Sequence, residues 1–356
     1  MKVEVFKIAQ SSPDDLTGLI ELIQNQKLDP KTIMAVMGKT EGNGCVNDFT
    51  RGFAVATLKA YLRSHIGEDL TSKIVFVMSG GTEGVLSPHL TVFTREIQKL
   101  DTPPHLGLAL GVHHTRNFSR DEIGTLVMVK VVAAGVEAAI AEAGLSPRNV
   151  HLVQIKCPLI TASGQGAGQS AITQDSYKSM AYSRGASALG VALALGEISL
   201  AQLTAADICH NFDLYSSVAS TSSGVELQNC EILVLGNSPN SYSNYLIGHS
   251  VMAHALDTTA VHRAIASSQD STISPNNSNP IVNVFAKAEA APSGQILGCR
   301  HTMLDDSDIN HTRMARAVVG ATIASIIQDP MIYVSGGSEH QGPAGGGPIA
   351  VISRRA

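Results

Sequence analysis

One pattern occurs three times in this chain: as Val77-Met78-Ser79-Gly80-Gly81-Thr82-Glu83, as Ser220-Thr221-Ser222-Ser223-Gly224-Val225-Glu226, and as Tyr333-Val334-Ser335-Gly336-Gly337-Ser338-Glu339. In each copy a serine precedes small residues, and a glutamate follows four positions on. The first and third copies come after apolar, strand-like runs, 74–78 and 331–334. A strand that ends in Ser-Gly presents a hydroxyl and backbone N–H groups to a ligand, because glycine allows close approach. Three copies predict an internal repeat.

A lysine and an arginine precede each serine stretch in the same order. Apolar strand-like runs end at Lys39, Lys156 and Lys287. Predicted helices begin at Arg51, Arg184 and Arg316. The expected order is strand, helix, strand with Lys, loop, helix with Arg, and strand with Ser. The sequence therefore predicts an α/β fold of three similar units, residues 1–100, 101–245 and 246–356, with a polar loop at 161–176 and a linker at 268–280.

The three lysines are candidates for acid–base chemistry. A lysine at the end of an apolar strand is partly desolvated, and desolvation lowers the pKa of an amine. A neutral lysine can act as the general base toward a serine hydroxyl. The alternative for any single copy is a strand-end lysine that points into water. Recurrence in three units favours the functional interpretation.

The arginines, serines and glutamates complete each set. A cation at a helix start is unfavourable for the helix dipole, so a guanidinium there is better explained by binding carbonyl or carboxylate oxygens. The alternative is a solvated arginine whose stem covers apolar neighbours. The serine stretches supply the donors of an oxyanion hole, or else form tight turns. Glu83, Glu226 and Glu339 are assigned a supporting role, holding the loop or orienting the lysine.

Composition narrows the partners and the compartment. The net charge of −5 offers no basic surface for nucleic acid or an anionic membrane, and aromatic residues make up only 4% with no tryptophan. The five cysteines are dispersed, and the N-terminus lacks the apolar core of a signal peptide. We therefore expect a cytoplasmic protein with reduced thiols. No H-E-x-x-H motif or Cys/His cluster indicates a catalytic zinc, so no cofactor is expected for the chemistry.

The Gly/Pro-rich segment 338–348 suggests a site for a hard cation. Such a loop exposes carbonyl oxygens, which suit Mg²⁺ or Ca²⁺. Glu289, two residues after Lys287, could supply a carboxylate. The alternative is a flexible C-terminal turn.

These motifs together resemble the cyanuric acid hydrolase/barbiturase family of cyclic amide hydrolases, over essentially the whole chain. The resemblance rests on segments 38–44, 78–84, 222–224 and 335–343. It implies three α/β units around a pseudo-threefold axis, with a barrel-like centre and outer helices, assembled as a homotetramer. It also implies that the active site lies on the axis, where three Ser–Lys pairs and three arginines surround a flat ring.

The resemblance further implies individual roles. The middle unit would carry the chemistry, with Lys156 as base and a serine of the Ser222-Ser223 pair as nucleophile. The other polar groups would bind ring carbonyls; these are Ser79, Gly80, Ser335, Gly336, Arg51, Arg184 and Arg316, with Lys39 and Lys287 beside them. A structural Mg²⁺ or Ca²⁺ would be held by Glu289 and by the backbone of Ser338, Gln341, Gly342, Pro343 and Gly346. Alignment of the three stretches by their glutamates selects Ser222, with Ser223 supplying a binding N–H.

Three functions are compatible with this pattern. The first is hydrolysis of cyanuric acid to carboxybiuret, and then to biuret and CO₂, because a ring with three carbonyls and three N–H groups matches three copies of one donor set. The second is hydrolysis of barbituric acid to ureidomalonate, in which one N–H is replaced by CH₂ and a polar partner is lost. The third is a non-catalytic protein that binds a planar heterocycle.

Overall fold

The computed structural model describes residues 1–97, 103–161, 171–269 and 280–355, and its main feature is three four-stranded sheets. The first sheet contains β1 (Lys2–Ala9), β2 (Ile33–Thr40), β3 (Val75–Gly80) and β4 (His89–Glu96). The second contains β5 (His105–His114), β6 (Val150–Pro158), β7 (Ala219–Gly224) and β8 (Glu231–Ser241). The third contains β9 (Tyr245–Met252), β10 (Ile281–Ala288), β13 (Tyr333–Gly336) and β14 (Gly347–Arg354).

The three sheets have the same topology. Their strand orders are β1-β4-β2-β3, β5-β8-β6-β7 and β9-β14-β10-β13. In each, the second and third strands are parallel, and the fourth strand lies antiparallel between the first and the second. A separate hairpin pairs β11 (Gln295–Ile296) with β12 (Cys299–Arg300). The predicted threefold repeat of an α/β unit is confirmed.

Each sheet draws its strands from one of the three predicted ranges, with β9 beginning one residue before the third range. The junction at 100/101, most of the polar loop 161–176 and most of the linker 268–280 lie outside the described residues.

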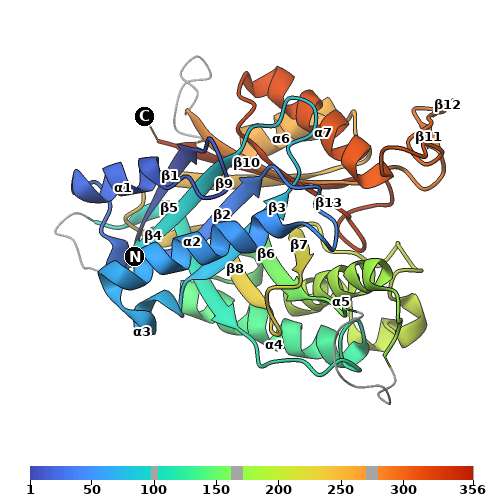
Figure 1. The fold of residues 1–356 in the computed structure, drawn as a ribbon, viewed down its shortest axis with the longest axis horizontal. Coiled ribbons are helices and arrows are strands. Elements are labelled where there is room, and N and C mark those ends of the chain that lie inside the picture. Colours follow the sequence, from blue (N-terminus) through green and yellow to red (C-terminus); the bar gives the residue numbers. More distant parts are fainter. Residues whose placement is uncertain (98–102, 162–170, 270–279, 356) are drawn as a thin grey trace.

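Helices cover the outer face of each sheet (Figure 1). They are α1 (Thr17–Gln24), α2 (Phe49–Ile66), α3 (Glu68–Thr71), α4 (Leu126–Ala143), α5 (Ser176–Leu195), α6 (Thr258–Ser267) and α7 (His311–Ile327). Short 3₁₀ turns occur at Pro30–Thr32, Pro147–Asn149, Leu200–Gln202 and Ala205–Asp207.

The helices that carry the three arginines begin at side-chain caps. Asp48, Asp175 and Asn310 each accept a backbone N–H of the first turn of α2, α5 and α7 respectively. The expectation that Arg184 and Arg316 begin their helices is wrong, because these caps start the helices earlier and place both arginines inside them. An unfavourable interaction between an arginine and the N-terminal end of a helix dipole is therefore expected at most for Arg51.

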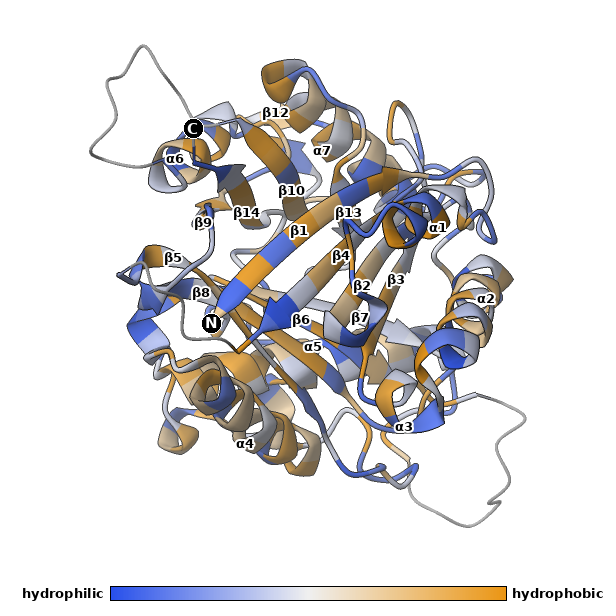
Figure 2. Cartoon of the chain, turned by 90° about the vertical axis from the view of Figure 1, so that its left-hand side faces the viewer, coloured by the Kyte–Doolittle hydropathy of each residue, from blue (hydrophilic) through white to orange (hydrophobic). Residues whose placement is uncertain are grey.

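Four apolar cores hold the fold together. The central core combines inward-facing side chains from all three sheets, among them Val77, Leu152, Phe285 and Tyr333. Each of the other three cores lies between one sheet and its own helices. Figure 2 shows the strands of the three units in the middle, with helices such as α2, α4 and α7 at the periphery. Because both faces of these sheets are buried, the sequences of their strands are continuous apolar runs. Within the described part of the chain, no helix is long and apolar enough to cross a membrane.

Candidate active site

The parallel strand pair of each unit places a lysine directly beside a serine. Lys39 pairs with Ser79 between β2 and β3, Lys156 with Ser222 between β6 and β7, and Lys287 with Ser335 between β10 and β13. The register is the same in all three units. It aligns Ser222, not Ser223, with Ser79 and Ser335, because Ser223 pairs with Cys157.

A small polar cavity joins the three units at these strand ends. It is lined by Gly44, Arg51, Ser79, Gly80, Met180, Arg184, Ser222, Ser223, Arg316, Ser335 and Gly336. The structure thus brings together all three predicted arginines and all three predicted serines. Met180 of α5 and Gly44 also line it, although neither belongs to the repeated Lys, Arg and Ser set.

The three lysines are fully buried, more completely than the partial desolvation expected from the sequence, with exposed fractions of 0%, 0% and 1% for Lys39, Lys156 and Lys287. Lys39 Nζ donates to Ser79 Oγ at 3.3 Å, and Lys287 Nζ donates to Ser335 Oγ at 3.2 Å. Burial, reinforced by Arg184, lowers the pKa of Lys287 to about 7. Burial, reinforced by Arg316, holds the pKa of Lys39 well below its ordinary value.

Lys156 has a different environment. Its Nζ forms an ion pair with Glu226 Oε1 at 2.9 Å and donates to the Met78 carbonyl at 2.9 Å. Burial lowers the pKa of Lys156, Glu226 raises it and Arg51 lowers it, so that it stays below the ordinary lysine value.

Two of the arginines are held by glutamates of a neighbouring unit. Glu83 binds Arg316 through two hydrogen bonds of 2.8 and 2.6 Å, and Glu339 binds Arg184 through two of 2.8 and 2.6 Å. These bidentate pairs fix the plane of each guanidinium. The predicted supporting role of Glu83 and Glu339 is therefore directed at arginine, not lysine.

Among the described residues, no glutamate forms a comparable bidentate pair with Arg51. Its Nη1 donates to the Ser223 carbonyl at 3.0 Å and its Nη2 to the Cys45 carbonyl at 2.7 Å, while its Nε lies 3.8 Å from an oxygen of Asp48. These contacts still place the guanidinium at the cavity wall.

The serine hydroxyls form a short network above the central core. Ser222 Oγ lies 2.9 Å from Ser335 Oγ, which in turn accepts from Lys287. Below them the Tyr333 hydroxyl is fully buried and has no hydrogen-bond partner in the described part of the chain. Burial raises the pKa of Tyr333, while its neighbours Ser222 and Ser79 lower it. The phenol is therefore neutral. Tyr333 occupies the position of Val77 and Ser220 in the other units, so the repeat did not mark it.

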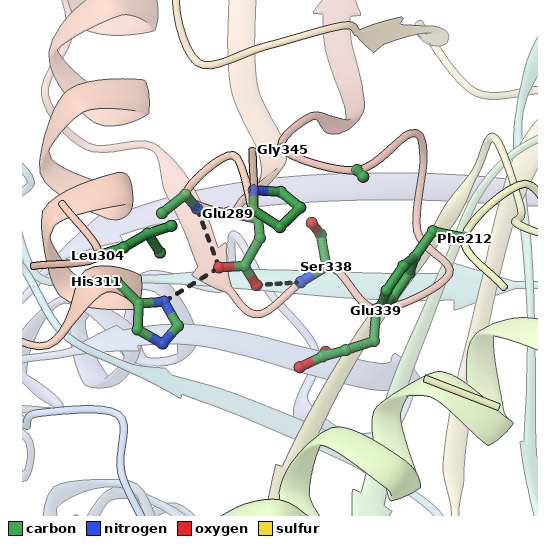
Figure 3. A pocket seen from close by; sticks show the side chains of 10 residues that line it. Phe212, Glu289, Leu304, His311, Ser338, Glu339 and Gly345 are labelled. Atoms are coloured by element: carbon green, nitrogen blue, oxygen red, sulfur yellow. Dashed lines mark hydrogen bonds and ion pairs between the residues drawn. The ribbon is translucent and has the colours of Figure 1, made fainter. Parts of the chain in front are cut away.

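The predicted cation site lies beside a second cavity (Figure 3). Of the six predicted residues, Glu289 and Ser338 line it, whereas Gln341, Gly342, Pro343 and Gly346 are not among its lining residues. The Glu289 carboxylate accepts the N–H groups of Ala290 and Ser338, and His311 Nδ1 lies 3.4 Å from it. Carboxylate oxygens suit Mg²⁺ or Ca²⁺, but the groups that contact Glu289 here are two backbone N–H groups and an imidazole nitrogen. The cation remains a prediction, since no group of three or more His, Cys, Asp or Glu side chains among the described residues could hold a metal.

Known proteins similar to this chain match it along its whole length. Residues 4–354 match the family model described as amidohydrolase ring-opening protein. A cyanuric acid amidohydrolase of Enterobacter cloacae is 49% identical over 372 residues and covers 100% of both chains. A cyclic amide hydrolase of Azorhizobium caulinodans is 47% identical over 365 residues, covering 99% of this chain and 100% of its own.

Two solved structures have the same fold. The crystal structure of the cyanuric acid hydrolase from A. caulinodans superposes with a TM-score of 0.92 at 47% identity, covering 100% of this chain and 99% of that one. A second structure, described as a cyanuric acid hydrolase that arose by structural concatenation, has a TM-score of 0.93 at 48% identity and covers 99% of each chain.

The fold, the Lys–Ser–Arg cavity and these matches define an amidohydrolase, an enzyme that cleaves amide C–N bonds. More particularly, the chain belongs to the family of ring-opening amidohydrolases. The alternative of a non-catalytic heterocycle-binding protein is therefore wrong.

Proposed function

We propose that this enzyme opens the ring of cyanuric acid to give carboxybiuret, which loses CO₂ to give biuret. The observation that carries the proposal is the identical register of the three Lys–Ser pairs around one polar cavity. Cyanuric acid presents three equivalent carbonyls, and three copies of a serine and an arginine supply a matching set of donors. The names of the relatives, most of them cyanuric acid amidohydrolases, support the same substrate.

Ser222 is the proposed nucleophile and Lys156 the proposed base. Lys156 takes the proton of Ser222, and Ser222 Oγ attacks a ring carbonyl. The C–N bond of the tetrahedral intermediate then breaks, Lys156 returns the proton to the leaving ring nitrogen, and water hydrolyses the acyl-enzyme. Their register supports this pairing, and the departure of the middle unit from the other two marks it as the specialised copy.

The remaining polar groups would bind and polarise the ring. Arg184 and Arg316, held rigid by Glu339 and Glu83, and Arg51, held by backbone carbonyls, can donate to the carbonyls that are not attacked. Backbone N–H groups of the serine stretches supply donors for the oxyanion. Preorganised donors of this kind cost no reorganisation during the reaction.

The test of the proposal is turnover of cyanuric acid by the wild type and by Ser222→Ala and Lys156→Ala variants. Biuret release should fall by about 10³-fold or more in both variants, since each removes a group that acts in the chemical step. Wild-type rates in either variant would overturn the assignment. Turnover of barbituric acid in parallel decides between the two ring substrates, and preferred release of ureidomalonate would overturn the choice of cyanuric acid.

We further propose a cytoplasmic homotetramer with a structural Mg²⁺ or Ca²⁺ at Glu289. The Glu289 carboxylate beside a cavity, together with the Gly/Pro-rich segment 338–348, supports the ion. Chelation followed by thermal unfolding tests it, with a lower Tm expected after removal of the cation.

A further inference from the structure

The backbone of the middle serine stretch differs from the other two. After Ser79 and Ser335 the strand ends at the next residue, and the chain turns at Gly81 and Gly337, whose φ angles are +103° and +80°. In the middle unit, β7 continues through Gly224, which pairs with Pro158 and has no positive φ. The local conformation, and not only the sequence, breaks the threefold repeat at this point.

This difference redirects the glutamate that follows. After the turns at Gly81 and Gly337, the carboxylates of Glu83 and Glu339 reach arginines of neighbouring units at 2.6 Å. After the extended Gly224, Glu226 folds back toward its own unit, so close that a Cβ on Gly224 would lie 2.1 Å from Glu226 Oε2. Its carboxylate therefore meets Lys156 Nζ at 2.9 Å instead of forming the equivalent pair with Arg51.

We propose that Glu226 is a positioning residue that singles out Lys156 as the base of the reaction. This inference rests on the proposed function and adds a reason why one of three similar Lys–Ser pairs carries the chemistry. The Glu226 carboxylate, together with the Met78 carbonyl, holds Lys156 Nζ in place. It also stabilises the ammonium that forms when the Ser222 proton moves to Nζ, and its own charge stays unchanged through the reaction.

Of the charged and titratable groups around Lys156, Glu226 is the one placed to stabilise its ammonium form. Arg51 faces Lys156 from α2 and disfavours the ammonium form. Glu231, the register partner of Lys156 on β8, is buried and accepts the N–H of Phe76 at 2.8 Å. The neighbouring Cys157 thiol is buried, and burial raises its pKa, so that it stays neutral. Glu226 is thus the carboxylate in direct contact with Nζ, and its side chain is 17% exposed.

The contrast with the other two lysines shows what the carboxylate changes. Lys39 and Lys287 donate to their own serines, and within the described part of the chain neither Nζ forms an ion pair with a carboxylate, whereas Lys156 Nζ does. A carboxylate in contact with an amine stabilises the protonated form of that amine, and so favours transfer of a proton to it. Contact with Glu226 keeps Lys156 basic enough to accept the proton of Ser222.

The experiment is the pH dependence of kcat and kcat/KM for cyanuric acid in Glu226→Gln, with Glu83→Gln as the matched control. The base acts as the free amine, so kcat/KM rises with pH through the pKa of Lys156. Removal of the carboxylate charge lowers that pKa, and the ascending limb should move to lower pH by about one unit, while the plateau kcat falls about tenfold. Glu83→Gln releases Arg316 and should raise KM without moving the limb.

A second variant tests the same role without removing a charge. In Gly224→Ala the new Cβ displaces the Glu226 carboxylate, and the extended backbone accepts alanine. This variant should shift the limb in the same direction as Glu226→Gln. An unshifted limb in both variants, or a rise in KM alone as in Glu83→Gln, would overturn the role of Glu226.

Lys156→Met separates this inference from the proposed function. Wild-type turnover by Lys156→Met would overturn the assignment of the base itself. An inactive Lys156→Met together with an unshifted limb in Glu226→Gln would overturn only the role of Glu226.

Discussion

The substitution Glu339→Gln tests the energetic contribution of the pair that joins the third unit to the second. Glu339 and Arg184 form two hydrogen bonds, and their side chains are 15% and 11% exposed. Glutamine keeps the shape and one acceptor but removes the charge. The buried guanidinium of Arg184 is then left without its counter-ion, which is the costly way to break a buried pair.

The expected magnitude follows from the burial of both partners. Loss of one partner of a buried pair costs about 3–5 kcal/mol, and the retained amide acceptor places Glu339→Gln near 3 kcal/mol. For 356 residues at roughly 2.1 cal/mol/K each, the entropy of unfolding is about 0.75 kcal/mol/K. The Tm should therefore fall by about 4 °C.

Thermal unfolding at neutral pH, beside the control Glu68→Gln, measures this difference. Glu68 pairs with Arg63 on the surface, where side chains are 62% and 53% exposed, so its loss should change the Tm by less than about 1 °C. Burial would raise the pKa of Glu339, but Arg184 outweighs it and the pKa lies below its ordinary value. The stabilisation is thus present above the ordinary glutamate pKa and lost as the pH falls through the lowered one. Equal Tm values for the two variants would refute the reasoning.

Two further predictions concern buried polar groups. His89 is fully buried, and burial lowers its pKa to about 4. The free energy of unfolding should therefore fall by up to about 3 kcal/mol as the pH falls from 6.5 toward 4. Urea unfolding should find a smaller loss in His89→Asn. The same pH dependence in both proteins would contradict this. Tyr333→Phe removes a buried hydroxyl without a partner and should raise the free energy of unfolding by about 1 kcal/mol. A lower value would instead indicate a hydrogen bond to Ser222 or Ser79.

Much of the fold was predictable because each unit repeats the same local sequence patterns. Each apolar run, polar loop and Ser-containing stretch recurs in the same order, and local periodicity is what the sequence displays most directly. The helix starts were harder to predict. The repeat predicts helix starts at Arg184 and Arg316, but the helices begin after the caps Asp175 and Asn310, which lie several residues earlier. Tyr333 was also missed, because its position below the serines depends on how three sheets meet.

The sequence by itself determined that there are three α/β units, each with one lysine, one arginine and one serine on equivalent elements. It also favoured Ser222 over Ser223 as the proposed nucleophile, since the spacing from Ser222 to Glu226 matches the spacing in the other copies. Only the tertiary structure decided which groups meet. The glutamates occupy equivalent positions in the sequence, yet two contact arginines of other units and one contacts Lys156. The physical reason is that a carboxylate's partner depends on the φ angle of a preceding glycine and on contacts across unit boundaries, and spacing along the chain encodes neither.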